Sequence, residues 1–473
     1  MAGARWARTH LVDAYCHGVD PGDLGLGAFE ARLPGAAAAG TTLFDSPIGF
    51  AVRRWCPPLL GLEPHCPPAR YLARRRELGA YEATRRLLRG TAITDYLVDT
   101  GEPGGLTPPK ELGAAGAAAA YEIVRLEPLA QQVADTSGTV DCFLANLAEA
   151  IHGAALTVAG FSCGDGAGAG RGRHARPGPS GAADEGYGGA DGGHAGDGDG
   201  RDDGGFGRFG IGRADAASAG FAALSGLPGF AGSPGSGDTG AAGFSGLPGF
   251  ADSSAPPGSS GWTDPEPVPY GSGRGYGTRP PDPVEVRYAA GRWLGGRPVG
   301  GRPTDPVLLR HLLWHAVATG LPLLLRHHPA GPGPLAGVDF LRATAGLGTD
   351  VVLVPGPAHQ AAAADLAAAL PHVYVALGTD PAAVLARAPF GKVLYASGAV
   401  GLPELYVTGT RGFRTALDRL VGERVGAGEW SAADGERVAA LVAEGNARRV
   451  YRLPPATGSR LPHPRFPFAD GGF

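Results

Sequence analysis

The chain has 473 residues, a formal net charge of −4 and a pI of about 6.4. This length suits one large domain or two ordinary ones, and the weakly acidic charge gives no basic footprint, so no nucleic-acid partner is expected. Glycine and proline together make up just over a quarter of the residues, a level at which disorder has to be considered.

The five cysteines are odd in number and form no CxxC pair: Cys16, Cys56, Cys66, Cys142 and Cys163. A disulfide framework or a zinc ribbon is therefore not expected, and a reducing, cytoplasmic location is the simpler interpretation. The first ten residues, "MAGARWARTH", lack the apolar core of a signal peptide. No run of about 18 apolar residues exists, so we expect no membrane span.

The first third of the chain predicts a series of strands and helices. Four strands are expected at 11–16, 93–101, 121–128 and 156–162. Helices are expected near 67–89 and 139–153. This alternation is typical of a parallel sheet covered by helices.

A glycine-rich stretch follows, and residues 161–280 hold 36 of the 81 glycines. It includes a short degenerate repeat around SGLPGFA. Its apolar content is too small to offset the cost of ordering the backbone, so 163–281 is predicted to be a disordered insertion. A surface loop without a role and a docking peptide made by the repeat are both compatible with this composition.

The last part of the chain returns to regular alternation. Asp305 is a predicted N-cap before Pro306, and Gly320 ends that helix. Further helices are expected at 338–346, at 358–370, at 380–388 and from Ser431 onward. Strands are expected at 321–327, 350–355, 372–378 and 392–398, as continuous apolar runs that suit buried parallel strands.

Eight βα units, with no GxGxxG after the first strand, favour a closed (β/α)8 TIM-like barrel over a doubly wound sheet. The predicted organisation is a first half-barrel at 1–162, the insertion at 163–281, a second half-barrel at 282–452 and a C-terminal tail at 453–473. Activity in such a barrel lies at the carboxyl ends of the strands.

Imidazoles and carboxylates at those strand ends suit a divalent metal that activates water. His17, Glu127 and His327 could form an open three-ligand site, with Arg125 and Arg326 as contacts for a small-molecule substrate. Each has an ordinary alternative: His17 could bond a loop, Glu127 could pair with either arginine, and His327 could face solvent.

Several stretches together resemble the amidohydrolase-related family. They are "LVDAYCHGV", "FDSPIGFAVRRWC", "YEIVRLEP", "HVYVALG", "GKVLYASGAVGLPELY" and "GNARRVY". The branch most similar is the amidohydrolase half of glutamine-synthetase-like fusion proteins. The resemblance implies a metal-dependent barrel, with zinc as the expected ion, that hydrolyses C–N or related bonds or decarboxylates.

The chain departs from the family pattern at the strand ends. Tyr15, Cys16 and His17 stand where the family has His-x-His, and Ser162 stands where a lysine is common. Strict register places Arg326 and Pro355 where two histidines are expected. Ser397 and Gly398 replace a Ser-Asp pair, so the usual carboxylate is missing. A one-residue slip turns strand side chains to the other face, so His327 could replace Arg326 only at a bulge or bend.

Three hypotheses follow, and the sequence leaves open whether the protein is an enzyme. It is a metal-dependent hydrolase with a reduced site, or a degenerate barrel that binds a small molecule or a protein. Alternatively, it is an unusual gene product in which the insertion displaces part of the barrel. Assembly into a homo-oligomer stays open as well.

Overall fold

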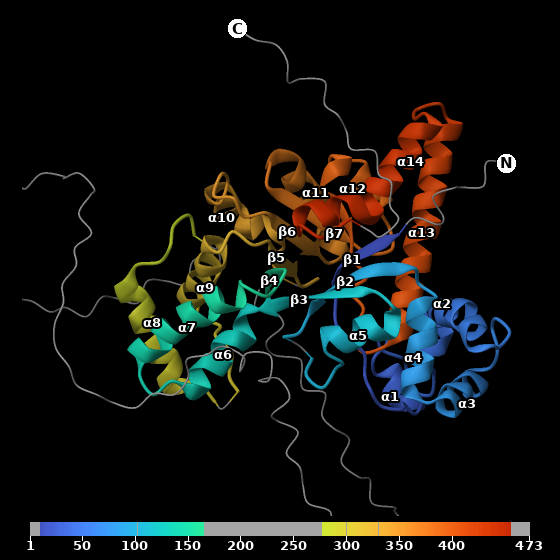
Figure 1. Cartoon of the computed structure of the whole chain (residues 1–473), viewed down its shortest axis with the longest axis horizontal. Coiled ribbons are helices and arrows are strands. Elements are labelled where there is room, and N and C mark those ends of the chain that lie inside the picture. Colours follow the sequence, from blue (N-terminus) through green and yellow to red (C-terminus); the bar gives the residue numbers. More distant parts are fainter. Residues whose placement is uncertain (1–9, 102, 165–276, 299, 330, 456–473) are drawn as a thin grey trace, which may run out of the picture. The chain divides into compact units, whose positions relative to one another are not determined.

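The computed structural model describes residues 10–101, 103–164, 277–298, 300–329 and 331–455 (Figure 1). These residues all belong to one compact unit. The predicted insertion at 163–281 and the tail at 453–473 therefore fall mostly outside the described residues. None of the described helices is both long and apolar enough to cross a membrane.

Eight parallel strands form one sheet in the order β1 to β8, so the predicted TIM-like fold class is confirmed (Figure 1). The strands are β1 Leu11–Cys16, β2 Ile93–Asp99, β3 Ala119–Arg125, β4 Gly160–Gly164, β5 Leu323–His327, β6 Val351–Pro355, β7 Val373–Leu377 and β8 Val393–Tyr395.

The two half-barrels join directly, because Ser162 of β4 pairs with Leu324 of β5. The ring is closed beyond the end of β8. There the Gly398 N–H donates to the Tyr15 carbonyl oxygen at 3.0 Å, and the His17 N–H donates to the Ala399 carbonyl oxygen at 2.9 Å. The barrel is thus complete without any residue of the stretch at 165–276.

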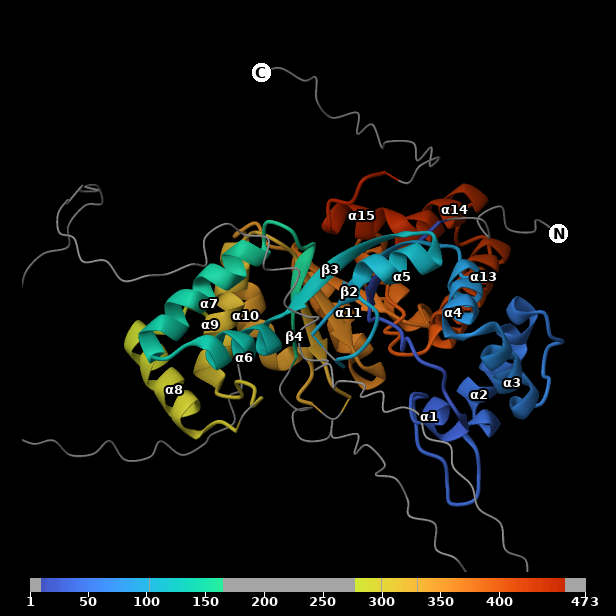
Figure 2. The ribbon, with the colours of Figure 1, turned by 60° about the horizontal axis from the view of Figure 1, so that its bottom comes forward.

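Helices follow the strands and cover the outside of the barrel (Figure 2). Those of the first half are α1 Leu26–Glu30, α2 Pro47–Trp55, α3 Pro68–Leu78, α4 Ala80–Arg89, α5 Pro109–Gly116, α6 Leu126–Thr136 and α7 Val140–Ala154. Those of the second half are α8 Pro283–Gly296, α9 Pro306–Ala318, α10 Val338–Ala343, α11 Gln360–Ala369, α12 Ala382–Leu385, α13 Pro403–Gly426, α14 Ala432–Ala440 and α15 Asn446–Val450.

Shorter turns complete the list: 3-10 segments η2 Leu43–Asp45, η3 Pro57–Leu60, η4 Pro334–Gly337, η5 Pro357–His359 and η6 Phe390–Lys392, and the π-helical turn η7 Leu441–Gly445. The predicted cap at Asp305 is confirmed, since its carboxylate accepts from the Val307 N–H at 2.9 Å. The helix expected from Ser431 onward is capped by this residue, whose hydroxyl oxygen accepts from the Asp434 N–H at 3.0 Å.

Two predicted helices need correction, and one helix was not predicted. The helix expected at 67–89 is two helices, because Gly79 (φ 78°, ψ 153°) has a backbone conformation that breaks it. The helix expected at 380–388 is the single turn α12. The longest described helix, α13, was not anticipated, since glycines interrupt its apolar pattern; it buries Tyr406, Phe413 and Leu417.

The apolar core has two layers that the alternation of strand side chains separates. One set fills the inside of the barrel, for example Val12, Leu97 and Leu324. The other lies between strands and helices, for example Leu323 and Leu325. Helix α15 adds Val450 and other side chains to the inner set.

The excursion between β1 and β2 has its own apolar core and packs on α13 (Figure 1). A buried ion pair secures it, because Arg75 Nε lies 2.9 Å from a carboxylate oxygen of Glu404. The Tyr71 hydroxyl donates to the same carboxylate at 2.6 Å. Since both partners are buried, this contact fixes the excursion beside the barrel.

Candidate functional site

A cluster of polar side chains occupies the inside of the barrel at the carboxyl ends of the first five strands. We call it the rim cluster, and it consists of Tyr15, Asp99, Arg125, Ser162 and Arg326. Alternation explains its position for β2, β3 and β5, where residues two positions earlier belong to the inner core. Parallel pairing then brings the strand ends together, as when Arg125 pairs with Ser162.

Asp99 is the centre of the rim cluster. Its Oδ2 accepts hydrogen bonds from Arg125 Nη2 at 2.8 Å and Ser162 Oγ at 2.8 Å. The Tyr15 hydroxyl donates to the same oxygen at 3.2 Å. Burial by itself raises the pKa of Asp99, but the charges of Arg125 and Arg326 and the hydrogen bond from Arg125 together outweigh it and hold the pKa below its ordinary value. Asp99 is therefore a buried, ionised carboxylate.

The Tyr15 hydroxyl is shared by both arginines of the cluster. It accepts from Arg326 Nη1 at 2.9 Å and from Arg125 Nη2 at 3.2 Å. The Arg326 guanidinium also lies over the Tyr15 ring, with 5.8 Å from its central carbon to the ring centroid. Burial, reinforced by the charge of Asp99, raises the pKa of Tyr15, so the phenol stays neutral.

The two arginines differ in how their charge is compensated. Arg125 is buried and pairs with Asp99. Arg326 is half-buried, and no carboxylate among the described residues forms an ion pair with it. Its Nε is buried and has no hydrogen-bond partner in the described part of the chain. Burial and the nearby charge of Arg326 lower the pKa of Arg302. Arg302 is therefore close enough to Arg326 to add to the positive field.

His17 lies beside the cluster and is almost fully buried. Its Nδ1 is 3.0 Å from the backbone carbonyl oxygen of Asp99; a carbonyl only accepts, so Nδ1 carries the proton in the neutral ring. Burial lowers the pKa of His17 to about 4, although Asp99 partly opposes this. The imidazole is therefore neutral at pH 7 and holds the loop after β2.

Glu127 lies in the first turn of α6, because β3 ends at Arg125 rather than continuing through the predicted 121–128. Its Oε1 accepts from the Gly164 N–H at 2.7 Å. Burial raises the pKa of Glu127. Among the described residues it forms no direct ion pair with Arg125 or Arg326, although both guanidiniums partly oppose the rise in its pKa.

His327 is the last residue of β5 and is buried, not solvent-exposed as one alternative held. The ladder between β5 and β6 is regular from Leu323 to His327, without a bulge. By alternation His327 shares the face of Leu323 and Leu325, which pack toward the helices. It lies on the opposite side of the strand from Arg326, so the bulge that would replace one by the other is absent from β5.

The described residues do not fit a catalytic divalent metal. In this part of the chain no three His, Cys, Asp or Glu side chains are placed to hold one, so His17, Glu127 and His327 do not form a ligand group. Two guanidiniums occupy the inside of the rim instead. Their permanent positive charge opposes a cation, which needs deprotonated ligands.

A second buried acid lies where the barrel closes. Asp13 of β1 accepts from the Ser397 hydroxyl at 2.5 Å and from the Ser397 N–H at 2.8 Å. Burial raises the pKa of Asp13 to about 7, although these hydrogen bonds oppose the effect. This pair ties β1 to the segment after β8.

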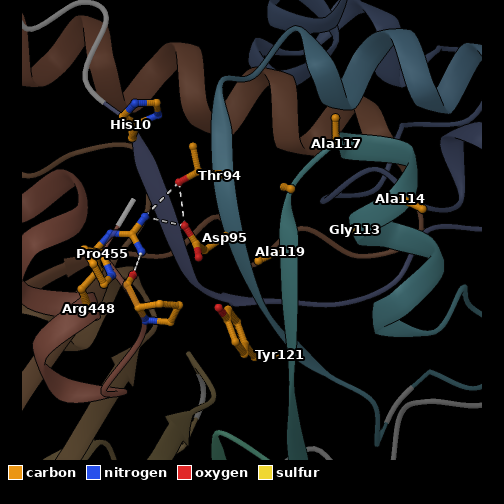
Figure 3. Close-up of a pocket in the computed structure, with 12 residues that line it drawn as sticks. His10, Thr94, Asp95, Gly113, Ala114, Ala117, Ala119, Tyr121, Arg448 and Pro455 are labelled. Carbon is orange, nitrogen blue, oxygen red and sulfur yellow. Dashed lines mark hydrogen bonds and ion pairs between the residues drawn. The ribbon is translucent and has the colours of Figure 1, made fainter. Parts of the chain in front are cut away.

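A cavity lies at the other end of the barrel (Figure 3). It measures about 490 Å³, and its polar wall includes Asp95 and Arg448. Arg448 bonds Asp95 at 2.6 Å, Glu444 at 3.0 Å and the Pro454 carbonyl oxygen at 2.6 Å. Because these bonds engage all three of its nitrogens, this wall is structural. A smaller hollow, about 280 Å³, lies beside α4 and α5.

The fold and the rim cluster together define a (β/α)8 barrel whose polar groups meet at the carboxyl ends of its strands. The structure is similar to a protein provisionally named a metal-dependent hydrolase, from Lactobacillus casei: TM-score 0.60, 14% identity, 94% of this chain and 95% of that chain covered. It is also similar to uronate isomerase from Thermotoga maritima: TM-score 0.50, 10% identity, 94% and 96% covered.

No protein-family model matches the sequence, and no curated protein matches it significantly. At these identities the structural likeness establishes the fold. The barrel that the family resemblance implied is therefore confirmed, and the activity rests on the chain's own residues.

The sequence identified Arg125 and Arg326 but not the group that organises them. Asp99 ends a strand that the sequence predicts, and Tyr15 and Ser162 lie within two residues of the ends of two others. The signal that could have identified them is that these strand ends lie side by side. A buried carboxylate at the end of one strand needs hydrogen-bond donors, which the ends of the neighbouring strands can supply.

Proposed function

We propose that this protein binds a small organic anion at the carboxyl-terminal mouth of its barrel, and that Arg326 holds the anion. The observation that carries the proposal is the incomplete compensation of Arg326. Its guanidinium is half-buried and donates to Tyr15, yet no carboxylate in the described part of the chain pairs with it. Asp99 and Glu127 feel its charge, but neither forms a direct ion pair with it. A partly buried cation without such a pair is costly, and a bound anion supplies one.

The geometry of Arg326 indicates an oxyanion. Nη1 is engaged by Tyr15, whereas Nε and Nη2 have no hydrogen-bond partner among the residues described. Unlike Nε, Nη2 is not buried, so Nη2 is the nitrogen that is open to an oxygen of a carboxylate. The orientation of Arg326 is fixed by its bond to Tyr15. Tyr15 is held in turn by Arg125, which is bonded to Asp99.

The other side of the mouth is apolar. At the ends of β6, β7 and β8 the inner face carries Val354, Ala376 and Ala396. Small apolar side chains opposite a guanidinium suit a ligand with one charged end and an apolar body. An aliphatic or aromatic monocarboxylate has this shape.

Metal-dependent hydrolysis of a C–N bond, which the family resemblance implies, is the second candidate, supported by the fold it shares with the Lactobacillus protein. The donor set argues against it in this chain, because His327 faces the helices and Glu127 is bonded to the Gly164 N–H. A protein partner, also considered from the sequence, has no comparable support at the rim.

The test is a thermal-shift and calorimetric screen of the full-length chain with monocarboxylates, each matched to its neutral amide. We expect carboxylates to raise the melting temperature and amides not to. Arg326→Gln should abolish the shift, whereas Arg387→Gln, which alters an exposed pair with Asp365, should keep it. Equal shifts from acid and amide, or undiminished binding by Arg326→Gln, would overturn the proposal.

A further inference from the structure

The smaller hollow lies on the outside of the barrel, between α4 and α5, which pack side by side (Figure 1 and Figure 2). We call it the α4–α5 hollow. The loops after β1 and β2 complete its wall, through residues that include Val19 and Thr107. Its volume of about 280 Å³ lies just below the range of pockets for drug-sized molecules, about 300–1,000 Å³. The hollow is therefore large enough for a small organic molecule.

Much of the lining is apolar. Val19, Leu112 and Ala115 belong to it and are buried in the core. Ala80 and Ala114 add short side chains that leave space between the two helices. Such a lining suits an aliphatic or aromatic body, because binding removes the apolar surface of that body from water.

One polar group of the lining lacks a partner. Thr84 of α4 is only 5% exposed, and its hydroxyl forms no hydrogen bond with a described residue. The hydroxyl oxygen is itself not fully buried, so it opens onto the hollow that Thr84 lines. The other threonine of the lining, Thr107, already accepts from the Val19 N–H at 3.1 Å. Because buried polar groups are nearly always hydrogen-bonded, Thr84 indicates a ligand that supplies a hydrogen-bonding group.

The charged side chains of the hollow are acidic. Asp20 and Glu111 line it, and no lysine, arginine or histidine is among its described lining residues. Asp20 pairs with Arg32. Glu111 is exposed and forms no ion pair in the part of the chain that the structure describes. Its negative charge favours a cation over an anion in the hollow.

An aromatic ring stands at the edge of the hollow. Tyr81 precedes Thr84 by three positions, so the two side chains share a face of α4. Tyr81 is 65% exposed, and no described arginine or lysine lies over its ring. The face of such a ring attracts a cation that touches it, so Tyr81 and Glu111 favour the same kind of ligand.

We infer that the α4–α5 hollow binds a small organic cation, an alkylamine with a compact apolar body. The body fills the apolar lining, and the ammonium group donates to the Thr84 hydroxyl beside the Tyr81 ring and in the negative field of Glu111. An alkylamine is protonated at pH 7, as the lysine side chain is. The hollow lies between helices that cover the barrel, whereas the proposed anion site lies inside its mouth, so the two sites are independent.

The experiment is isothermal titration calorimetry of the full-length chain with cyclohexylamine, at pH 7 and low ionic strength, beside cyclohexanol, which has the same shape without the charge. We expect saturable binding of one amine per chain and far weaker binding of the alcohol. Thr84→Val keeps the shape and should weaken amine binding by about ten-fold. It should fold normally, because the hydroxyl bonds no described residue. Tyr81→Ala and Glu111→Gln, both exposed changes, should each weaken binding by about two- to five-fold.

Three control variants locate the amine. Tyr288→Ala removes an exposed ring on α8, and Glu436→Gln alters an exposed carboxylate on α14; both should leave binding unchanged. Arg326→Gln should do so too, which separates this site from the anion site. Melting without ligand checks that each variant folds. Equal binding of amine and alcohol, no saturable amine binding, undiminished binding by Thr84→Val, or loss of binding in Arg326→Gln would overturn the inference.

Discussion

Replacing Asp13 by asparagine removes a carboxyl group that the barrel buries completely between β1 and the segment after β8. The shape is kept, because the asparagine oxygen can still accept from the Ser397 N–H and its amide can donate to the Ser397 hydroxyl. The change therefore isolates the cost of burying a negative charge.

The magnitude follows from the pKa of Asp13. Folding raises it from 3.8 to about 7, so the folded state binds the proton more tightly than the unfolded chain. The stabilisation is full below pH 4 and is lost as the pH rises to 7. At 1.36 kcal/mol per pKa unit, the loss is about 4 kcal/mol. The free energy of unfolding of Asp13→Asn, relative to the unaltered protein, should rise by this amount and level off above pH 7.

The assay is urea unfolding of both proteins at pH 4 to 8, with the difference taken at each pH so that other carboxylates cancel. Asp339→Asn alters an exposed carboxylate and should give a difference that does not change with pH. If the difference between Asp13→Asn and the unaltered protein is also independent of pH, the Asp13 carboxyl has the same pKa in the folded and unfolded states. The seam between β1 and β8 would then be open to water, contrary to the structure.

Three further predictions rest on buried groups. Tyr15→Phe removes the hydroxyl that Arg125 and Arg326 share and should cost about 1–3 kcal/mol of unfolding free energy in urea; no loss would mean that water replaces it. A thiol reagent should label one cysteine quickly, the exposed Cys142, and all five after unfolding; two fast thiols would contradict the burial. Glu404→Leu leaves Arg75 buried and unpaired and should lower stability by about 3–5 kcal/mol, whereas an unchanged urea midpoint would show that the pair is dispensable.

The sequence by itself determined the barrel. A short apolar run between helical stretches predicts each strand. Connections between parallel strands follow strict rules, so only a few chain topologies are compatible with this order of elements. The same local information indicated that Arg326 and His327 face opposite sides of β5, because side chains alternate along any strand. The regular ladder of β5 agrees with this.

Only the tertiary structure decided which of these side chains meet. Asp99 bonds Ser162, 63 positions away, and Asp13 bonds Ser397, 384 positions away; no local pattern specifies such pairs. In the structure β3 ends at Arg125, so Glu127 lies on helix α6 and not on the strand. The physical reason is that periodicity fixes the face of a strand, whereas the partner of a buried charge depends on the register between strands and on how the ring closes.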